Sequence, residues 1–187
     1  MPDSYDAKLV RRAQAGDRRA VGELYDLYNE RIFRYVWSRV SHREQAEDLT
    51  GEVFTRMVSK LGDYSPQGVP FQAWLYRIAH NLVIDHYRKE GGRVVISLDH
   101  AEGLHGEKGN TAAVVEQHLT MQQVRDALQN LDPLQREVLA LRFLGGLSLR
   151  EVAITIDKTV SAVKALQYRG LVALRAELQV TKQRIEP

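Results

Sequence analysis

An apolar stripe at helical spacing is the feature that most limits how this chain can fold. Seven residues recur every three or four positions, so one long helix would carry them all on a single face: Val21, Leu24, Tyr25, Tyr28, Ile32, Tyr35 and Val36. Helical spacing returns in 71–89 and again from 114 onward, and no strand-like alternation runs for more than a few residues. The sequence therefore predicts an all-α fold.

Capping residues mark the ends of the first helices. A short helix over 6–15 is expected to end at Gly16, and Asp17 can cap the long helix that follows. Ser41 and Glu44 stand at the spacing of a capping box, which predicts the start of another helix. The other expected segments of this half are a helix over 42–60, a loop over 62–70 and a helix over 71–89.

The composition changes between residues 90 and 112. This segment contains five glycines and one short apolar run, and its hydrophobic periodicity is poor, as is typical of a flexible linker. We therefore predict two helical domains, over 5–89 and 113–179, joined by a linker over 90–112. With 44% apolar residues, the chain has enough to give each domain a core.

The C-terminal domain is predicted to contain four helices that end in a helix-turn-helix. Helices are expected over 114–131 and over 134–144, the second opened by Asp132 and Pro133. Ser148 and Glu151 then form a capping box. A turn at 157–158 leads into a longer helix, and the small side chain of Ala153 would let the two helices approach closely.

The outer face of this last helix carries residue types that read duplex DNA: Ser161, Lys164, Ala165, Tyr168 and Arg169. Lysine and arginine can bond phosphates or guanine edges, and an alanine methyl can touch a thymine methyl. From residue 158 to 175 there are four basic residues and no acidic one. On spacing alone, an ordinary helical hairpin with a solvated basic face would also fit.

The helix over 71–89 mixes aromatic rings with cations. Proteins that hold single-stranded DNA need this mixture, because unpaired bases stack on rings while nearby cations neutralise the backbone. Asn81 could read an extruded base through its amide. Trp74 alone is weak evidence, because a tryptophan at helical spacing is more often in a core. His80 and His86 are expected at the surface.

Four acidic residues crowd the helix over 42–60: Glu44, Glu47, Asp48 and Glu52. They fit either a solvated face or a docking surface for a basic partner.

Several function classes are excluded by what the sequence lacks. The chain has no cysteine, which excludes disulfides, thiol catalysis and thiolate zinc sites. It has no paired carboxylates at metal spacing, no phosphate-cradling glycine loop and no nucleophile with a base. We expect no catalytic activity, cofactor, metal or small-molecule substrate. The N-terminus lacks a signal pattern and no stretch approaches ~18 apolar residues, so we expect a cytoplasmic protein without membrane insertion.

Four separated blocks together resemble bacterial sigma factors of the extracytoplasmic-function group (group IV). The blocks are 46–54, 71–89, 131–153 and 163–175, and the resemblance covers about residues 5–178. It implies a region 2-like domain over 5–89 and a region 4-like domain over 113–179. It further implies a subunit that binds core RNA polymerase, directs it to specific promoter DNA and helps melt the minus-ten region to initiate transcription, under control of an anti-sigma factor.

The resemblance also implies roles for individual residues. Polymerase docking would fall to Asp48, Leu49, Glu52, Val53 and Phe54. Minus-ten contacts would fall to Tyr64, Phe71, Trp74, Arg77, Asn81 and Arg88. Minus-thirty-five contacts would fall to Ser161, Lys164, Ala165, Tyr168 and Arg169. In the recognition helix, Leu166 stands where many members have an arginine, Ala165 replaces a commoner serine, and Gly170 costs about 1 kcal/mol relative to alanine unless close packing requires it.

A stand-alone helix-turn-helix repressor or activator, with an N-terminal oligomerisation or sensor domain, is the alternative function. Such a protein would bind its operator without polymerase, usually as a dimer on a palindrome. A sigma factor should instead recognise an asymmetric two-part promoter, and only together with polymerase. An enzyme acting on nucleic acid is a remote third candidate, because the chain lacks the residues that such chemistry requires.

Overall fold

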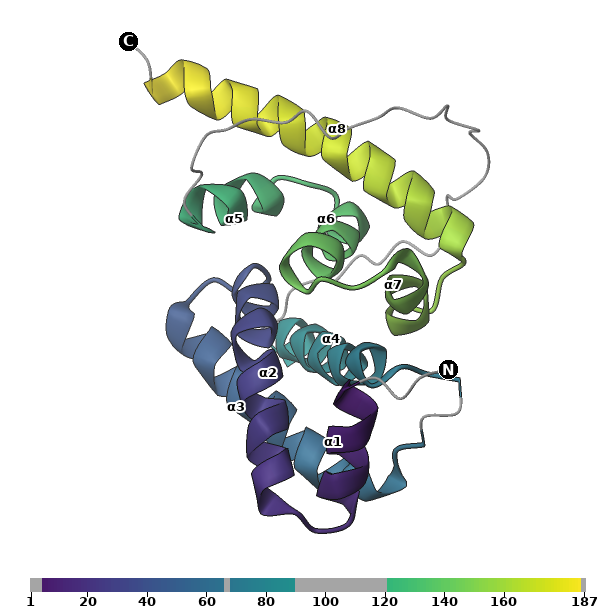
Figure 1. The fold of residues 1–187 in the computed structure, drawn as a ribbon. Helices are drawn as coiled ribbons and strands as arrows, with labels where there is room; N and C mark the ends of the chain where they lie inside the picture. Colours follow the sequence, from purple (N-terminus) through teal and green to yellow (C-terminus); the bar gives the residue numbers. More distant parts are fainter. Residues whose placement is uncertain (1–4, 66–67, 90–120, 186–187) are drawn as a thin grey trace.

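The computed structural model describes residues 5–65, 68–89 and 121–185, so the predicted linker over 90–112 lies outside the described residues. Within them, every regular element is helical (Figure 1), which confirms the all-α prediction. The elements are α1 (Tyr5–Gln14), α2 (Arg18–Trp37), α3 (Arg43–Lys60), a 3-10 turn (Leu61–Asp63), α4 (Phe71–Lys89), α5 (Met121–Gln129), α6 (Pro133–Leu139), a π-helical turn (Ala140–Leu144), α7 (Leu149–Thr155) and α8 (Val160–Ile185).

In the N-terminal half, residues 5–89, helix α2 supplies the central apolar stripe. Its buried residues include Leu24, Tyr28, Ile32, Tyr35 and Val36, five of the seven predicted members. Tyr25 differs, because 43% of its surface is exposed and its ring packs on the ring of Phe54 at 4.7 Å. Helices α1, α3 and α4 all contact α2.

Two helix starts in the N-terminal half were predicted from capping residues, one at Asp17 and one at Ser41. Asp17 caps α2 as predicted, and its carboxylate accepts from the backbone N–H groups of Arg19 and Ala20. The prediction of a capping box at Ser41 is wrong. Helix α3 begins one residue later, at Arg43, so His42 is its N-cap, and the His42 N–H donates to the Gln45 side chain at 3.4 Å.

The helix starts of the C-terminal half, residues 121–185, follow the sequence closely. The Asp132 carboxylate accepts from the N–H groups of Leu134 and Gln135, and Pro133 opens α6. Ser148 and Glu151 form the predicted capping box, with backbone-to-side-chain bonds of 2.7 and 3.2 Å. The helix predicted over 134–144 is α-helical only to Leu139 and then widens into the π-helical turn.

Two adjacent glycines close that π-helical turn for different reasons. A Cβ on Gly145 would lie 2.7 Å from the carbonyl oxygen of Leu141 and 2.8 Å from a ring carbon of Tyr76, so the close packing leaves no room for a side chain. Gly146 has a φ of +73°, which lies in the left-handed region that glycine adopts most easily. The chain can therefore turn sharply from α6 into α7.

The two halves pack against each other around a shared apolar core. Tyr35 and Tyr76 from the N-terminal half belong to the same buried cluster as Val138, Leu141 and Leu147 from the C-terminal half. In Figure 1, α4 lies beneath α6 and α7, and α8 crosses their far side. None of the described helices is both long and apolar enough to cross a membrane.

Candidate nucleic-acid interface

Helix α8 presents one exposed face near its N-terminus. All five residues predicted there are exposed, namely Ser161, Lys164, Ala165, Tyr168 and Arg169, and Tyr168 is 60% exposed. The opposite side of the helix enters the core through Val163 and Leu166. Leu166 therefore takes no part in the exposed face, so an apolar residue at this position removes no surface contact.

Gly170 is the point where α8 comes closest to α6. A Cβ at this position would lie 3.1 Å from Leu139 and 3.3 Å from the Cβ of Gln135. Close packing therefore accounts for a glycine in the middle of a helix.

The orientation of α8 is fixed by contacts on its own half. The turn after α7 passes through Asp157 with a φ of 55°, and the N–H of Lys158 donates to the carbonyl of Ala153. The Thr159 hydroxyl accepts from the N–H of Ala162 at 3.1 Å and so caps the first turn of α8. From the π-helical turn, Arg142 donates to Gln167 at 2.9 Å.

Helix α4 has two chemically different sides. Gln72, Tyr76 and His80, spaced four apart, make hydrogen bonds to the C-terminal half. The predicted DNA-contacting residues occupy other positions: Arg77, Asn81 and Arg88 are exposed, and Trp74 is half-buried. Packing of the two halves therefore leaves Arg77, Asn81 and Arg88 open to solvent.

Trp74 belongs to an aromatic cluster with Tyr64 and Phe71. The ring centroids are 4.9 Å apart for Tyr64 and Trp74 and 5.5 Å apart for Phe71 and Trp74. Tyr64 and Phe71 were predicted as DNA contacts, and in the structure they are only 8% and 5% exposed and pack against the tryptophan. In this conformation they hold Trp74 in place and are covered themselves.

Hydrogen bonds hold the loop that carries Tyr64. The Tyr64 hydroxyl donates to the carbonyl of Val69 at 2.8 Å, and Gln14 donates to the carbonyls of Leu61 and Tyr64 at 2.8 and 2.7 Å. Burial, with a smaller effect of the Asp6 carboxylate, raises the pKa of Tyr64. Tyr64 therefore remains a protonated donor at neutral pH.

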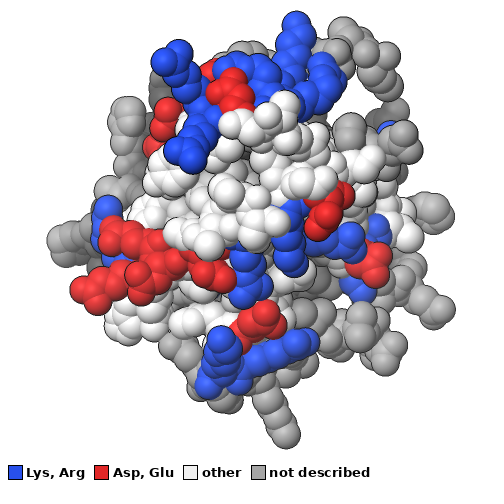
Figure 2. All heavy atoms as spheres, turned by 90° about the horizontal axis from the view of Figure 1, so that it is seen from below, with Lys and Arg blue, Asp and Glu red and all other residues white. Residues whose placement is uncertain are grey.

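Helix α3 carries the predicted acidic surface. Glu44, Glu47, Asp48 and Glu52 are all exposed, and two of them pair within the helix, Glu47 with Arg43 and Glu52 with Arg56, both at 2.8 Å. Figure 2, which views the molecule from below the orientation of Figure 1, shows the largest group of acidic side chains at the left and smaller acidic groups among the basic side chains elsewhere. Such exposed pairs contribute little stability, so these carboxylates remain available to a partner.

Burial divides the five residues predicted to dock on polymerase. Asp48 and Glu52 are exposed and Leu49 is half-buried, whereas Val53 and Phe54 are 0% and 6% exposed. Val53 and Phe54 belong to the core of the N-terminal half and support the helix from beneath.

The expectation that His80 lies at the surface is wrong. Its side chain is 15% exposed, and its Nδ1 lies 3.0 Å from a carboxylate oxygen of Glu137, so it is no surface histidine. Glu137 and Arg39, both buried, were missed because nothing in the local sequence of either residue reveals a partner so far along the chain. Within the described residues, no cluster of three or more His, Asp or Glu side chains could hold a metal ion.

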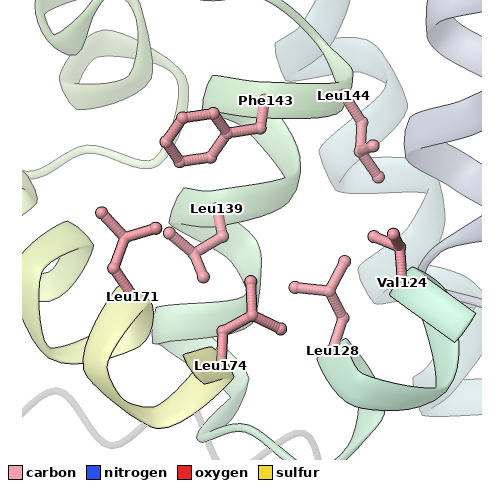
Figure 3. A pocket seen from close by; sticks show the side chains of 7 residues that line it. All are labelled: Val124, Leu128, Leu139, Phe143, Leu144, Leu171 and Leu174. Carbon is pink, nitrogen blue, oxygen red and sulfur yellow. The ribbon is translucent and has the colours of Figure 1, made fainter. Parts of the chain in front are cut away.

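A purely apolar pocket of about 200 Å³ opens between α5, α6, the π-helical turn and α8. Figure 3 shows its lining side chains pointing toward one another: Val124, Leu128, Leu139, Phe143, Leu144, Leu171 and Leu174. Phe143 lies on the rim and is 57% exposed. The pocket has no polar lining that would orient a small ligand.

Two family models match the chain, Sigma-70 region 2 over residues 24–93 and Sigma-70 region 4 over residues 121–174. The extracytoplasmic-function sigma factor SigD of Mycobacterium tuberculosis is 32% identical over 175 residues, covering 91% of this chain and 82% of SigD. This chain belongs to the extracytoplasmic-function sigma factors. Region 2 contains α3, α4 and most of α2, whereas region 4 contains α5 to α7 and most of α8.

Other relatives agree with this assignment. The sigma factor BldN of Streptomyces coelicolor is 39% identical over 164 residues, covering 88% of this chain but only 62% of BldN. Among solved structures, CnrH in complex with the cytosolic domain of CnrY aligns with a TM-score of 0.72 and 26% identity, covering 94% of this chain and 97% of CnrH.

Proposed function

We propose that this sigma factor binds core RNA polymerase, directs it to promoters with minus-ten and minus-thirty-five elements, and helps melt the minus-ten region. The observation that carries the proposal is the presence of two separate exposed faces suited to different forms of DNA. One lies on α4 in region 2, and the other on α8 in region 4. We propose that the two domains span residues 5–89 and 113–179.

The α8 face is proposed to read the minus-thirty-five element in the major groove. Lys164 and Arg169 can bond phosphates or guanine edges, and Ala165 can contact a thymine methyl. Ser161, at the N-terminal end of the helix, would enter the groove first. The exposed Tyr168 adds a ring and a hydroxyl beside them.

The α4 face is proposed to hold the opened minus-ten strand. Trp74 offers a ring for base stacking, supported from beneath by Tyr64 and Phe71. Asn81 is one helical turn beyond Arg77, and both are exposed, so an amide and a cation lie on the same side of the helix. Arg88 would neutralise the backbone further along.

The acidic surface of α3 is proposed to dock on a basic surface of core polymerase. Asp48, Leu49 and Glu52 would make the contacts, and the buried Val53 and Phe54 would keep α3 in position. Complementary charge of this kind speeds encounter and fixes orientation more than it adds affinity.

We further propose that a separate anti-sigma protein controls this sigma factor. We also propose that the sigma factor acts in the cytoplasm and catalyses no reaction itself. The sigma factor RpoE of Bartonella quintana, which shares this fold, was solved in complex with the anti-sigma factor NepR. The supporting observation on this chain is the apolar pocket in region 4, whose lining offers contact area to an apolar partner.

Run-off transcription with purified core polymerase tests the proposal. Adding the chain should produce transcripts that start at defined positions on some genomic templates, and core polymerase alone should not produce them. Tight binding of the free chain to a palindrome, with no specific transcript from any template, would support the stand-alone repressor instead.

A further inference from the structure

Four polar side chains meet where the two halves of the chain pack together, and three of them, Tyr35, Arg39 and Glu137, are buried. Glu137, on α6, is 2% exposed, and its carboxylate oxygen Oε1 accepts from the Tyr35 hydroxyl at 2.6 Å. The same oxygen lies 3.0 Å from Nδ1 of His80, and Oε2 lies 3.1 Å from a guanidinium nitrogen of Arg39. A single carboxylate of the C-terminal half therefore faces three groups of the N-terminal half.

The charge state of this cluster is set by its partners. Burial alone would raise the pKa of Glu137, but the Arg39 guanidinium, the His80 ring and the Tyr35 hydroxyl together lower it to about 2. Glu137 is therefore ionised at neutral pH, and its contact with Arg39 is a buried ion pair that joins the two halves.

Other polar contacts lie along the same boundary. The carbonyl oxygen of Gly145 accepts from the Tyr76 hydroxyl at 3.2 Å and from the Gln72 amide at 3.0 Å. Arg125 on α5 donates to the backbone carbonyl of Val40 at 2.8 Å, and its guanidinium lies over the Trp37 ring at 5.7 Å. The two halves thus meet in a defined arrangement with directional bonds at several points.

This closed arrangement cannot span a promoter. The minus-ten and minus-thirty-five elements are separated by about 25 base pairs, or about 85 Å at the rise of B-form DNA. Helix α4 nevertheless contacts α7, which is joined directly to α8, and all 26 residues of α8 extend only about 39 Å. The α4 and α8 faces therefore cannot reach their two elements until the halves separate.

We propose that Glu137, with Arg39, His80 and Tyr35, forms a latch that holds the free sigma factor closed and must open before both faces engage DNA. The proposal rests on the promoter-binding function proposed above. Within the described residues, Nε and Nη1 of Arg39 are buried without a hydrogen-bond partner, so this ion pair is only partly satisfied. When the two halves separate, the charged groups of this ion pair become hydrated again, which offsets part of the cost of breaking it. The ion pair therefore fixes how the halves pack without preventing their separation.

Glu137→Gln is the direct test of the latch. The change preserves the shape of the side chain but leaves the buried Arg39 charge without its counter-charge, and only in the closed form. We expect the ratio of open to closed molecules to rise by at least about tenfold. The double variant Arg39→Gln with Glu137→Gln should return this ratio toward the wild-type value, because no unpaired charge remains.

The distance between the halves is the readout. The chain has no cysteine, so Ser59→Cys on α3 and Ala176→Cys on α8, both exposed, provide a unique pair of labelling sites for fluorescence energy transfer. Glu30→Gln is the matched control, because the same chemical change falls on a carboxylate with 73% side-chain exposure. Arg125→Ala tests the far edge of the boundary in case Glu137→Gln impairs folding, which thermal melts would reveal.

The latch is supported if the wild type and the Glu30→Gln control are closed and the distance between the labels is longer in Glu137→Gln or Arg125→Ala. A wild type that is already open, or equal distances in all variants, would overturn it. These measurements use the free chain, so they are independent of polymerase.

Polymerase binding then separates the latch from the proposed function. Variants that open should bind core polymerase more tightly, in proportion to their open fraction. If the variants open but none of them binds core polymerase, the latch is supported and the proposed function is contradicted.

Discussion

Gly145→Ala should destabilise the protein, although alanine normally favours folded backbone over glycine. The backbone at Gly145 has a φ of −80° and a ψ of −25°, which alanine adopts without strain, so the whole cost is steric. The new Cβ would meet the Leu141 carbonyl oxygen at 2.7 Å, a Tyr76 ring carbon at 2.8 Å and a Leu147 methyl at 3.0 Å. A backbone carbonyl cannot move aside as a flexible side chain can.

The surrounding bonds set the size of the effect. Gly145 donates to the Ala140 carbonyl at 2.9 Å and accepts from Tyr76 and Gln72, so shifting the turn to relieve the clash would break these bonds. Overpacking in a well-packed core costs about 1–3 kcal/mol. For a chain of this length, a loss of about 2 kcal/mol corresponds to a fall in Tm of about 4–8 °C.

Gly22→Ala is the matched control. Gly22 lies within α2, and a Cβ there would meet nothing within 4 Å, so the same substitution should raise stability by up to about 1 kcal/mol. Calorimetric melts of the three proteins measure both effects. Equal stability of Gly145→Ala and the wild type would refute the argument that close packing at this turn leaves no room for a side chain.

Three further predictions concern the proposed contacts. Lys164→Ala should weaken promoter binding by the polymerase complex across sequences and lower the slope of log affinity against log salt by about 1, as expected for one lost phosphate contact. Asn81→Ala should slow open-complex formation, followed by permanganate reactivity, more than it weakens polymerase binding; an equal loss of both would contradict the role assigned to α4. Asp48→Ala should weaken polymerase binding in a pull-down titration without lowering Tm, whereas Phe54→Ala should lower stability by about 3–5 kcal/mol because it opens a cavity. The opposite pattern would show that Phe54 docks directly.

Local signals in the sequence predicted the helices well. Asp17, Asp132 and Ser148 each cap a helix through bonds to residues two or three positions away, so their role is visible in a short window. The Ser41 prediction failed because a second set of residues one position later, His42 and Gln45, can make a similar cap.

The sequence separated exposed from buried positions less well in the candidate site. Periodicity places Leu166 on the same helix as Ala165, but the packing of α8 against α6 and α7 decides that Leu166 faces inward. Val53 and Phe54 follow Glu52 directly, and only the packing of α3 buries them while leaving Glu52 exposed. The side of a helix that meets a neighbour depends on contacts between elements, which spacing along one element does not contain.

The contact between the halves was beyond sequence reasoning. His80 and Glu137 are 57 positions apart and Tyr35 and Glu137 are 102 apart, so no local pattern connects them. A buried glutamate on a short amphipathic helix looks like an ordinary surface residue until its partners are placed around it.

Footprinting of the complex between core polymerase and this chain, on a promoter identified by run-off transcription, tests the central claim most directly. We predict two protected segments about 25 base pairs apart centre to centre, with reactive thymines only in the downstream one, and no protection by the chain alone at the same concentration. Protection of a single palindrome by the free chain, unchanged by polymerase, would contradict it.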